Sequence, residues 1–175
     1  MNHKQQIDRL YKLDVSPEAI EYAKQFSSSK KAWDACKRGD WMLCLLGRLA
    51  GDIDSDSRKK LVLCACKCAR LSLEYVKKGE KRPLTAIQTA ENWARGIKGV
   101  TIKDVSDAAS AAYAASDAAY ATSAAYAAAS AAYAAYAAST AASTAASAAI
   151  APDARTRTLK KCADIVRGFY PNPPN

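Results

Sequence analysis

The sequence predicts an all-α protein, a helical bundle of short N-terminal helices with one long alanine-rich helix and a short C-terminal helix. Apolar residues recur at spacings of three and four along most segments, and no segment alternates in the way a strand does. Serine, aspartate, proline and glycine stand where helices begin and end. Residues 108–151 contain 27 alanines, and alanine has the highest helix propensity.

The first three predicted helices are short. Residues 2–14 carry apolar side chains at the spacing of an amphipathic helix. Ser16 and Pro17 then form a start signal, because serine caps a helix and proline is tolerated in its first turn. The serine run at 27–29 ends this second helix and caps the third, which places Trp33 on an apolar face.

Glycines divide the next part of the chain. We expect Gly39 to break the third helix and Asp40 to cap an apolar helix over residues 41–49. A long helix should follow over residues 58–78, where apolar residues and cysteines recur every three or four positions. Gly79 should end it.

The pattern then predicts a helix over residues 84–95, opened by Pro83 in its first turn. Glycines within residues 96–99 form a hinge after it. Thr101 and Asp104 have the spacing of a capping box, with aspartate in place of the usual glutamate, so the next helix should begin here.

No glycine or proline occurs from residue 100 to 151, so a single helix of roughly 70 Å could run through the alanine-rich stretch. Pro152 should end it, and residues 154–169 predict a last amphipathic helix. These boundaries divide the chain into 1–99, 100–151 and 152–175, which we expect to pack as one domain.

An alanine stripe buries little area but lets another helix approach closely. The alanine-rich helix therefore needs a long partner. That partner could be the other helices, the same segment bent back on itself, or a second copy of the chain in a homodimer.

The net charge of +9 is uneven, with +7 in residues 1–107 and +3 in residues 152–175. A basic surface attracts nucleic acid, anionic membranes or acidic protein partners, and it also keeps a protein in solution. The polar first residues lack the apolar run of a signal peptide, and serine and threonine oppose insertion of the alanine-rich stretch into a membrane. We therefore expect a cytoplasmic protein with no membrane contact and six reduced, mostly buried cysteines.

Motifs for catalysis, metals and cofactors are incomplete. The single histidine, His3, argues against a histidine-based nucleophilic site, and there is no glycine-rich phosphate loop. The acidic run 52–56 begins like a calcium loop but lacks its glycine and its last glutamate. Cys64 and Cys68 share a helix face but have no second ligand pair. We expect no enzyme, no metal and no cofactor.

Two stretches, 33–43 and 79–96, place polar residues among core-forming ones. Glu91 and Arg95 are four apart in the orientation that favours an ion pair, and we expect Arg70 and Arg82 to reach Asp34, Asp40 or Glu80. These groups are either caps and interhelical salt bridges or a recognition patch rimmed by tryptophan. The candidate interaction residues are Trp33, Asp34, Asp40, Trp41, Glu80, Arg82, Glu91 and Arg95.

Three segments carry a family resemblance: WDACKRGDWMLCLLG, RKKLVLCACKCAR and GEKRPLTAIQTAENWARG. Over roughly residues 30–170 the chain resembles the Imm-5-like putative immunity proteins of bacteria and their phages. The resemblance implies neutralisation of a toxin by binding, and it brings no established functional residues with it.

These observations favour a non-catalytic binding protein that neutralises an effector, such as a toxin or a nuclease. One alternative is a phage-encoded inhibitor of a bacterial defence system such as CRISPR. Another is a basic nucleic-acid-binding protein, which is less favoured because aromatic residues do not interleave with the basic ones. Because the chain is basic, an effector would have to offer an acidic surface or an already bound nucleic acid.

Overall fold

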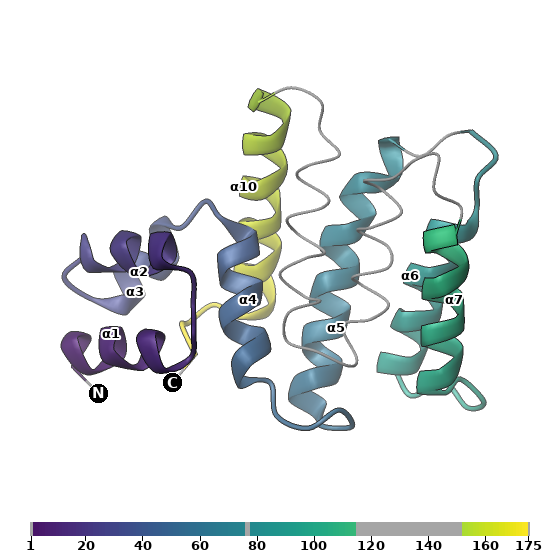
Figure 1. Cartoon of the computed structure of the whole chain (residues 1–175), viewed down its shortest axis with the longest axis horizontal. Helices are drawn as coiled ribbons and strands as arrows, with labels where there is room; N and C mark the ends of the chain where they lie inside the picture. Colours follow the sequence, from purple (N-terminus) through teal and green to yellow (C-terminus); the bar gives the residue numbers. More distant parts are fainter. Residues whose placement is uncertain (1, 76–77, 115–151, 175) are drawn as a thin grey trace.

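The structure is a computed structural model that describes residues 2–75, 78–114 and 152–174. These residues form helices joined by turns and contain no strand, so the predicted all-α class is confirmed (Figure 1). The helices are α1 His3–Lys12, α2 Pro17–Lys24, α3 Ser29–Ala35, α4 Gly39–Leu49, α5 Asp56–Ala69, the 3₁₀ turn η1 Arg70–Tyr75, α6 Arg82–Ala94, α7 Ile102–Ala114 and α10 Pro152–Phe169.

The expected long helix over residues 100–151 enters this description only through α7. Residues 115–151 lie outside the described residues, and so does the proposed homodimer contact along them. Pro152 is the first residue of α10, and its predicted role in ending the alanine-rich helix lies outside the described residues. No described helix is both long and apolar enough to cross a membrane.

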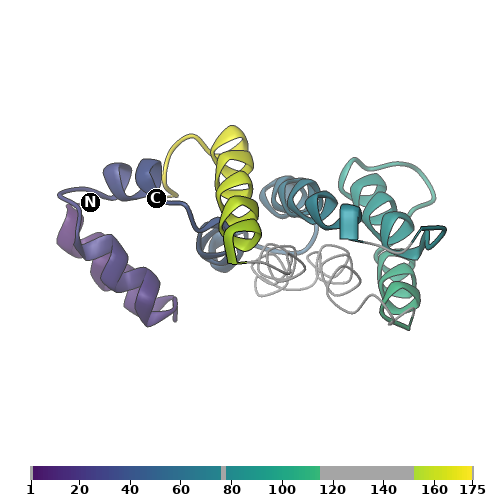
Figure 2. The same cartoon turned by 90° about the horizontal axis from the view of Figure 1, so that it is seen from above.

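The helices are arranged in a row (Figures 1 and 2). Helices α1–α3 gather at one end, α4 and α10 lie side by side next to them, α5 follows, and α6 and α7 form the other end. A large apolar cluster joins residues of α4, α5, α6 and α10, and a smaller one lies beneath α1 and α2. The last helix of the chain therefore completes the core begun by α4 and α5.

Helix starts follow local side-chain chemistry as predicted. The hydroxyl of Ser16 accepts a hydrogen bond from the backbone of α2, and Ser28 does the same for α3. At α7, the carboxylate of Asp104 accepts from the backbone N–H of Thr101 at 2.7 Å, and the Thr101 hydroxyl accepts from the N–H of Asp104 at 3.3 Å. The predicted capping box is thus confirmed.

Asp40 is not a helix cap, and that prediction is wrong. Helix α3 already ends at Ala35, and Gly39 is the first residue of α4 rather than a breaker of α3. The Asp40 carboxylate lies in the first turn of α4 and accepts hydrogen bonds from the guanidinium of Arg38. Asp40 can still favour the helix start through the dipole.

The predicted helix over residues 58–78 is also interrupted. An α-helix runs from Asp56 to Ala69, and the tighter 3₁₀ winding begins at Arg70. The backbone N–H of Arg70 donates to the carbonyl of Cys66, four residues earlier, so α-helical bonding extends to Arg70 before the winding tightens.

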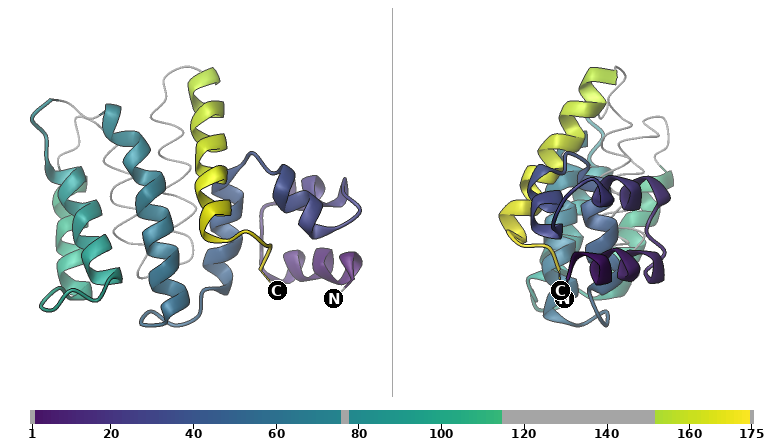
Figure 3. Two further views of the ribbon diagram at one scale, coloured as in Figure 1. Left: turned by 180° about the vertical axis from the view of Figure 1, so that it is seen from behind. Right: turned by 90° about the vertical axis from the view of Figure 1, so that its left-hand side faces the viewer.

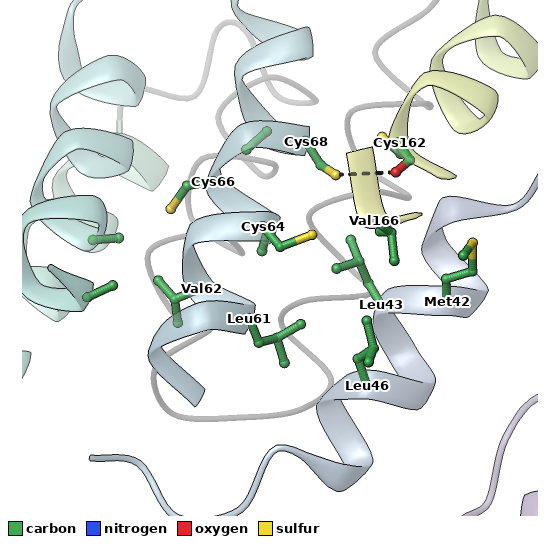
Figure 4. Close-up of a cluster of buried hydrophobic side chains, with 14 of the residues drawn as sticks. Met42, Leu43, Leu46, Leu61, Val62, Cys64, Cys66, Cys68, Cys162 and Val166 are labelled. Carbon is green, nitrogen blue, oxygen red and sulfur yellow. Dashed lines mark hydrogen bonds between the residues drawn. The ribbon is translucent and has the colours of Figure 1, made fainter. Parts of the chain in front are cut away.

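Helix α5 is buried on both flanks, and its cysteines belong to the core (Figure 4). The thiol of Cys66 points towards α6 and donates to the carbonyl of Ile87 at 3.8 Å. Cys64 and Cys68 point the other way, and the Cys68 thiol donates to the carbonyl of Cys162 in α10 at 3.9 Å. All six cysteines are free thiols, and burial raises the pKa of Cys66.

Helices α4 and α10 approach each other closely at Gly39. A Cβ atom added at Gly39 would lie 2.4 Å from the Cβ of Cys162 and 2.6 Å from the backbone nitrogen of Ala163. Real Cβ atoms do not approach so closely, so only glycine allows the start of α4 to contact α10 at this distance.

We expect Gly39→Ala to lower the free energy of unfolding by about 1–3 kcal/mol, because the two helices must move apart to admit a methyl group. Gly168→Ala is the matched control, since a Cβ there meets nothing within 4 Å. It should be neutral or stabilise α10 by about 0.5–1 kcal/mol. Urea unfolding measures both, and equal stability of the two variants would contradict the close helix contact.

Thiol labelling provides a second check on the core. Five cysteines are buried and Cys44 is half-buried, so a thiol reagent should label at most Cys44 rapidly in the folded protein and all six after denaturation. Cys44→Ser should remove the rapid phase. Rapid labelling of most thiols in the native state would show that α5 is not packed as described.

Candidate functional site

The sequence-predicted interaction residues form two groups rather than one patch. Trp33, Asp34, Asp40 and Trp41 lie on α3 and α4, while Glu80, Arg82, Glu91 and Arg95 lie on or beside α6. Helix α5 stands between α4 and α6 (Figure 1). A single recognition patch that combines both stretches is therefore not formed.

In the first group, charge is neutralised locally. The guanidinium of Arg38 donates to the buried Asp40 carboxylate at 2.9 and 2.5 Å and lies 4.2 Å from the ring centroid of Trp41. The hydrogen bonds to Asp40 raise the pKa of Arg38. Exposed Asp34 pairs with Lys30 at 2.6 Å, one helical turn away. Neither Arg70 nor Arg82 reaches Asp34 or Asp40; of the three predicted partners only Glu80 is reached, by Arg82, and the expectation is wrong for Arg70.

Trp33 is a packing residue, because only 5% of its surface is exposed. Its indole N–H donates to the carbonyl of Tyr170 at 2.9 Å. The guanidinium of Arg167 donates to the carbonyls of Trp33 and Cys36 at 3.2 and 2.7 Å. These bonds join α3 to the C-terminal end of α10, and no sequence periodicity relates residues so far apart.

The second group centres on Glu91, which is buried beneath two arginines. Arg70 donates two hydrogen bonds to its carboxylate, at 2.9 and 2.8 Å, while Arg95 lies 3.8 Å away. The predicted Glu91–Arg95 pair is confirmed, yet the main partner is Arg70, which was expected elsewhere. The hydrogen bonds from Arg70 hold the pKa of Glu91 below its usual value.

Glu80 and Arg82 form a local pair in the turn before α6. The guanidinium of Arg82 donates to the Glu80 carboxylate at 2.9 and 2.5 Å, as expected for one of its predicted partners. Together with a bond from the backbone N–H of Arg82, this pairing lowers the pKa of Glu80 to about 2. The pair organises the start of α6 and remains at the surface.

A further charged surface runs along the outer side of α5, and sequence reasoning missed it. Side chains spaced by three and four residues share a helix face, and on α5 this face carries the cations that the core excludes. We name it the basic face and define it by Lys59, Lys60, Leu63, Lys67, Arg70 and Leu71, with Arg95 of α6 and Lys161 of α10 beside them.

Two lysines of the basic face lie over aromatic rings of the C-terminal region. The ammonium group of Lys60 is 4.5 Å from the ring centroid of Tyr170, and that of Lys67 is 6.0 Å from the ring of Phe169. Figure 3 shows α5 and α10 side by side on this side of the molecule. Lys161 lies eight residues before Phe169, two helical turns along the same side of α10.

Among the side chains that the structure describes, the six cations of the basic face stand beside the carboxylates of Asp56, at the beginning of α5, and Glu91. Glu91 is already bound by Arg70, so the lysines remain available to an external anion. Half-buried Leu63 and Leu71 lie between them and add apolar area. Such a surface suits the binding of an acidic macromolecule. Across the described ranges, no group of three His, Cys, Asp or Glu residues could hold a metal ion.

Comparison with known proteins places most of the basic face inside one family. The model of the family described as "Imm-5 like putative immunity protein" matches residues 51–160, which include α5, α6 and α7. No curated protein and no solved structure matches the chain.

Removing the Arg70 guanidinium that binds Glu91 should destabilise the fold, by an amount that depends on pH. At neutral pH we expect Arg70→Ala to cost about 1–2 kcal/mol, less than a fully buried pair because the Arg70 side chain is 38% exposed. The pKa of Glu91 is lowered in the folded state, so this stability is present above the ordinary glutamate pKa and is lost as pH falls through the lowered one.

Thermal unfolding, measured from neutral pH down through the lowered pKa of Glu91, tests this prediction. The difference in stability between wild type and Arg70→Ala should shrink as the pH falls. The matched control is Lys103→Ala in the exposed Lys103–Asp107 pair, which should leave stability nearly unchanged at every pH. A cost for Arg70→Ala that does not depend on pH would mean that packing, rather than the ion pair, is responsible.

Proposed function

Because this chain belongs to the Imm-5-like family of immunity proteins, we propose that it neutralises a protein toxin by binding it, without catalysis. The family match over residues 51–160 carries this proposal, and it covers the α5 and α6 part of the basic face. An immunity protein must recognise its toxin in a fixed geometry. A rigid, charged helix surface supports that kind of recognition.

The proposed contact is between the basic face and an acidic surface of the toxin. Helix α5 is held by a fully buried core on its inner side, so the positions of Lys59, Lys60 and Lys67 are set before binding. Complementary charge would speed encounter and select the partner, while Leu63 and Leu71 would add apolar contact. A defence nuclease or another effector with an acidic surface would be bound in the same way.

A binding role without chemistry is supported by the state of the reactive groups near this face. The carboxylate of Glu91 is held in ionised form by Arg70, which opposes its use as an acid. The thiols of Cys64, Cys66 and Cys68 are buried beneath the face, and burial raises the pKa of Cys66, which opposes nucleophilic use.

Stoichiometry tests the proposal. The immobilised chain would be used to capture its toxin from host extract, and the purified toxin would then be titrated with the purified chain while its toxic activity is measured. Neutralisation by binding predicts a linear loss of activity that ends at a fixed, near-equimolar ratio and is reached at once. Time-dependent inactivation by far less than one equivalent would indicate a catalyst and would overturn the proposal.

Charge reversal tests the surface. The pair Lys60→Glu and Lys67→Glu should weaken neutralisation strongly, because two attractive contacts become repulsive. Lys12→Glu and Lys98→Glu, at exposed positions on α1 and after α6, make the same change in net charge and should have little effect. An equal loss of neutralisation in both double variants would indicate that neutralisation depends on the net charge of the chain rather than on the basic face.

Direct nucleic-acid binding is the second candidate, favoured by the net charge of +9. A gel shift with random DNA and RNA at low salt, repeated at increasing salt, separates the two. Binding that falls steeply with salt and needs Lys60 and Lys67 would favour nucleic acid. No shift at about 50 mM salt, where phosphate contacts are strong, would exclude it and leave the acidic protein surface.

A further inference from the structure

A second site lies away from the basic face, where α1–α3 meet α4 and the C-terminal tail (Figure 1). A cavity of about 100 Å³ is lined mainly by aromatic and aliphatic side chains. The lining includes Leu10, Tyr22, Trp33, Trp41, Leu45 and Pro174. These residues lie outside the segment 51–160 that matches the family, so the cavity is a feature of the other parts of this chain.

The walls of the cavity are held in place by interactions that do not involve a ligand. The indole of Trp33 is fixed by its bond to Tyr170, which also holds the tail that carries Pro174. The ring of Tyr22 lies 5.7 Å from that of Trp41, and its hydroxyl donates to the carbonyl of Ala32 at 3.4 Å. The cavity is therefore formed in advance, as ligand pockets usually are.

Polar groups line one side of the cavity, on α1 and the start of α3. The hydroxyl of Ser29 donates to the side-chain carbonyl of Gln6, so these two groups satisfy each other. Arg9 also lines the cavity, and within residues 2–75, 78–114 and 152–174 its guanidinium has no hydrogen-bond, ion-pair or ring partner. A cation without a partner beside an apolar cavity favours a ligand that is both apolar and anionic.

The volume limits the apolar part of such a ligand. An apolar cavity of about 150 Å³ can hold benzene, so about 100 Å³ admits a short branched chain or part of a single ring, with the remaining atoms at the open side. Water gains little there, because few wall groups can hydrogen-bond with it. A long acyl chain would not fit.

We propose that this cavity binds a small organic carboxylate with one ring or a short branched chain. The apolar group lies between Trp33 and Trp41, and the carboxylate pairs with Arg9. This binding is independent of toxin neutralisation, since it uses residues outside the basic face and can be measured without a toxin.

The test uses 3-phenylpropionate as the probe and tryptophan fluorescence of the full chain as the readout. Trp33 and Trp41 line the cavity, whereas Trp93 lies in α6, so a Trp93→Phe variant should keep the full signal change. We expect a saturable change with the acid. The neutral analogue 3-phenylpropionamide should bind about tenfold more weakly, the loss of one charge-assisted hydrogen bond.

Two variants with matched controls locate the ligand. Ala23→Phe places a ring in the cavity and should abolish binding, whereas Ala35→Phe, at an exposed position of α3, should not. Arg9→Gln should reduce acid binding to the level of the amide, whereas Lys12→Gln removes the same charge from the same helix and should leave it unchanged. Circular dichroism checks that each variant keeps its helices.

Two results would overturn the proposal. One is the absence of saturable binding of the acid at millimolar concentration by the folded wild-type chain. The other is binding that Ala23→Phe leaves intact, or that does not distinguish acid from amide. If Ala23→Phe fails to fold, Arg9→Gln and the amide comparison decide the question. Toxin neutralisation that fails while the acid binds would leave this site in place.

Discussion

The rest of the structure depends on the close contact between the first turn of α4 and the middle of α10. Gly39 has no side chain, so the backbone of α4 approaches Cys162 and Ala163 to a distance that no other residue allows. This contact seats α10 against α4 and α5 and buries Cys162 and Val166 completely. Helices α4 and α5 each have an apolar face to bury, and α10 supplies apolar surface that completes their core.

The basic face and the apolar cavity both depend on this position of α10. At its C-terminal end, α10 places Phe169 and Tyr170 beneath lysines of α5, and the tail after it lines the apolar cavity. The buried carboxylates Asp40 and Glu91 are each paired with a nearby arginine, as burial of a charge requires. The lysines of α5 do not pair with these buried carboxylates, and their charge lies at the surface.

The candidate residues show how far sequence reasoning reaches in locating a site. The Glu91–Arg95 and Glu80–Arg82 pairs were predictable, because their spacing along the chain places them within reach. Arg70 as the main partner of Glu91 was not, since it depends on how α5 and α6 pack. Trp33 was one candidate for the rim of an interface, yet it is buried, and its bond to the carbonyl of Tyr170 depends on how the C-terminal end of the chain packs.

The sequence by itself determined the all-α class, the caps at Ser16, Ser28 and Thr101, and the amphipathic α10, because these depend on neighbours within one or two helical turns. Only the tertiary structure decided the roles of Gly39, Arg70 and Arg167, the basic face and the cavity. Each of these arises where segments distant in the chain meet, and there the packing of side chains sets which groups are buried, paired or left exposed.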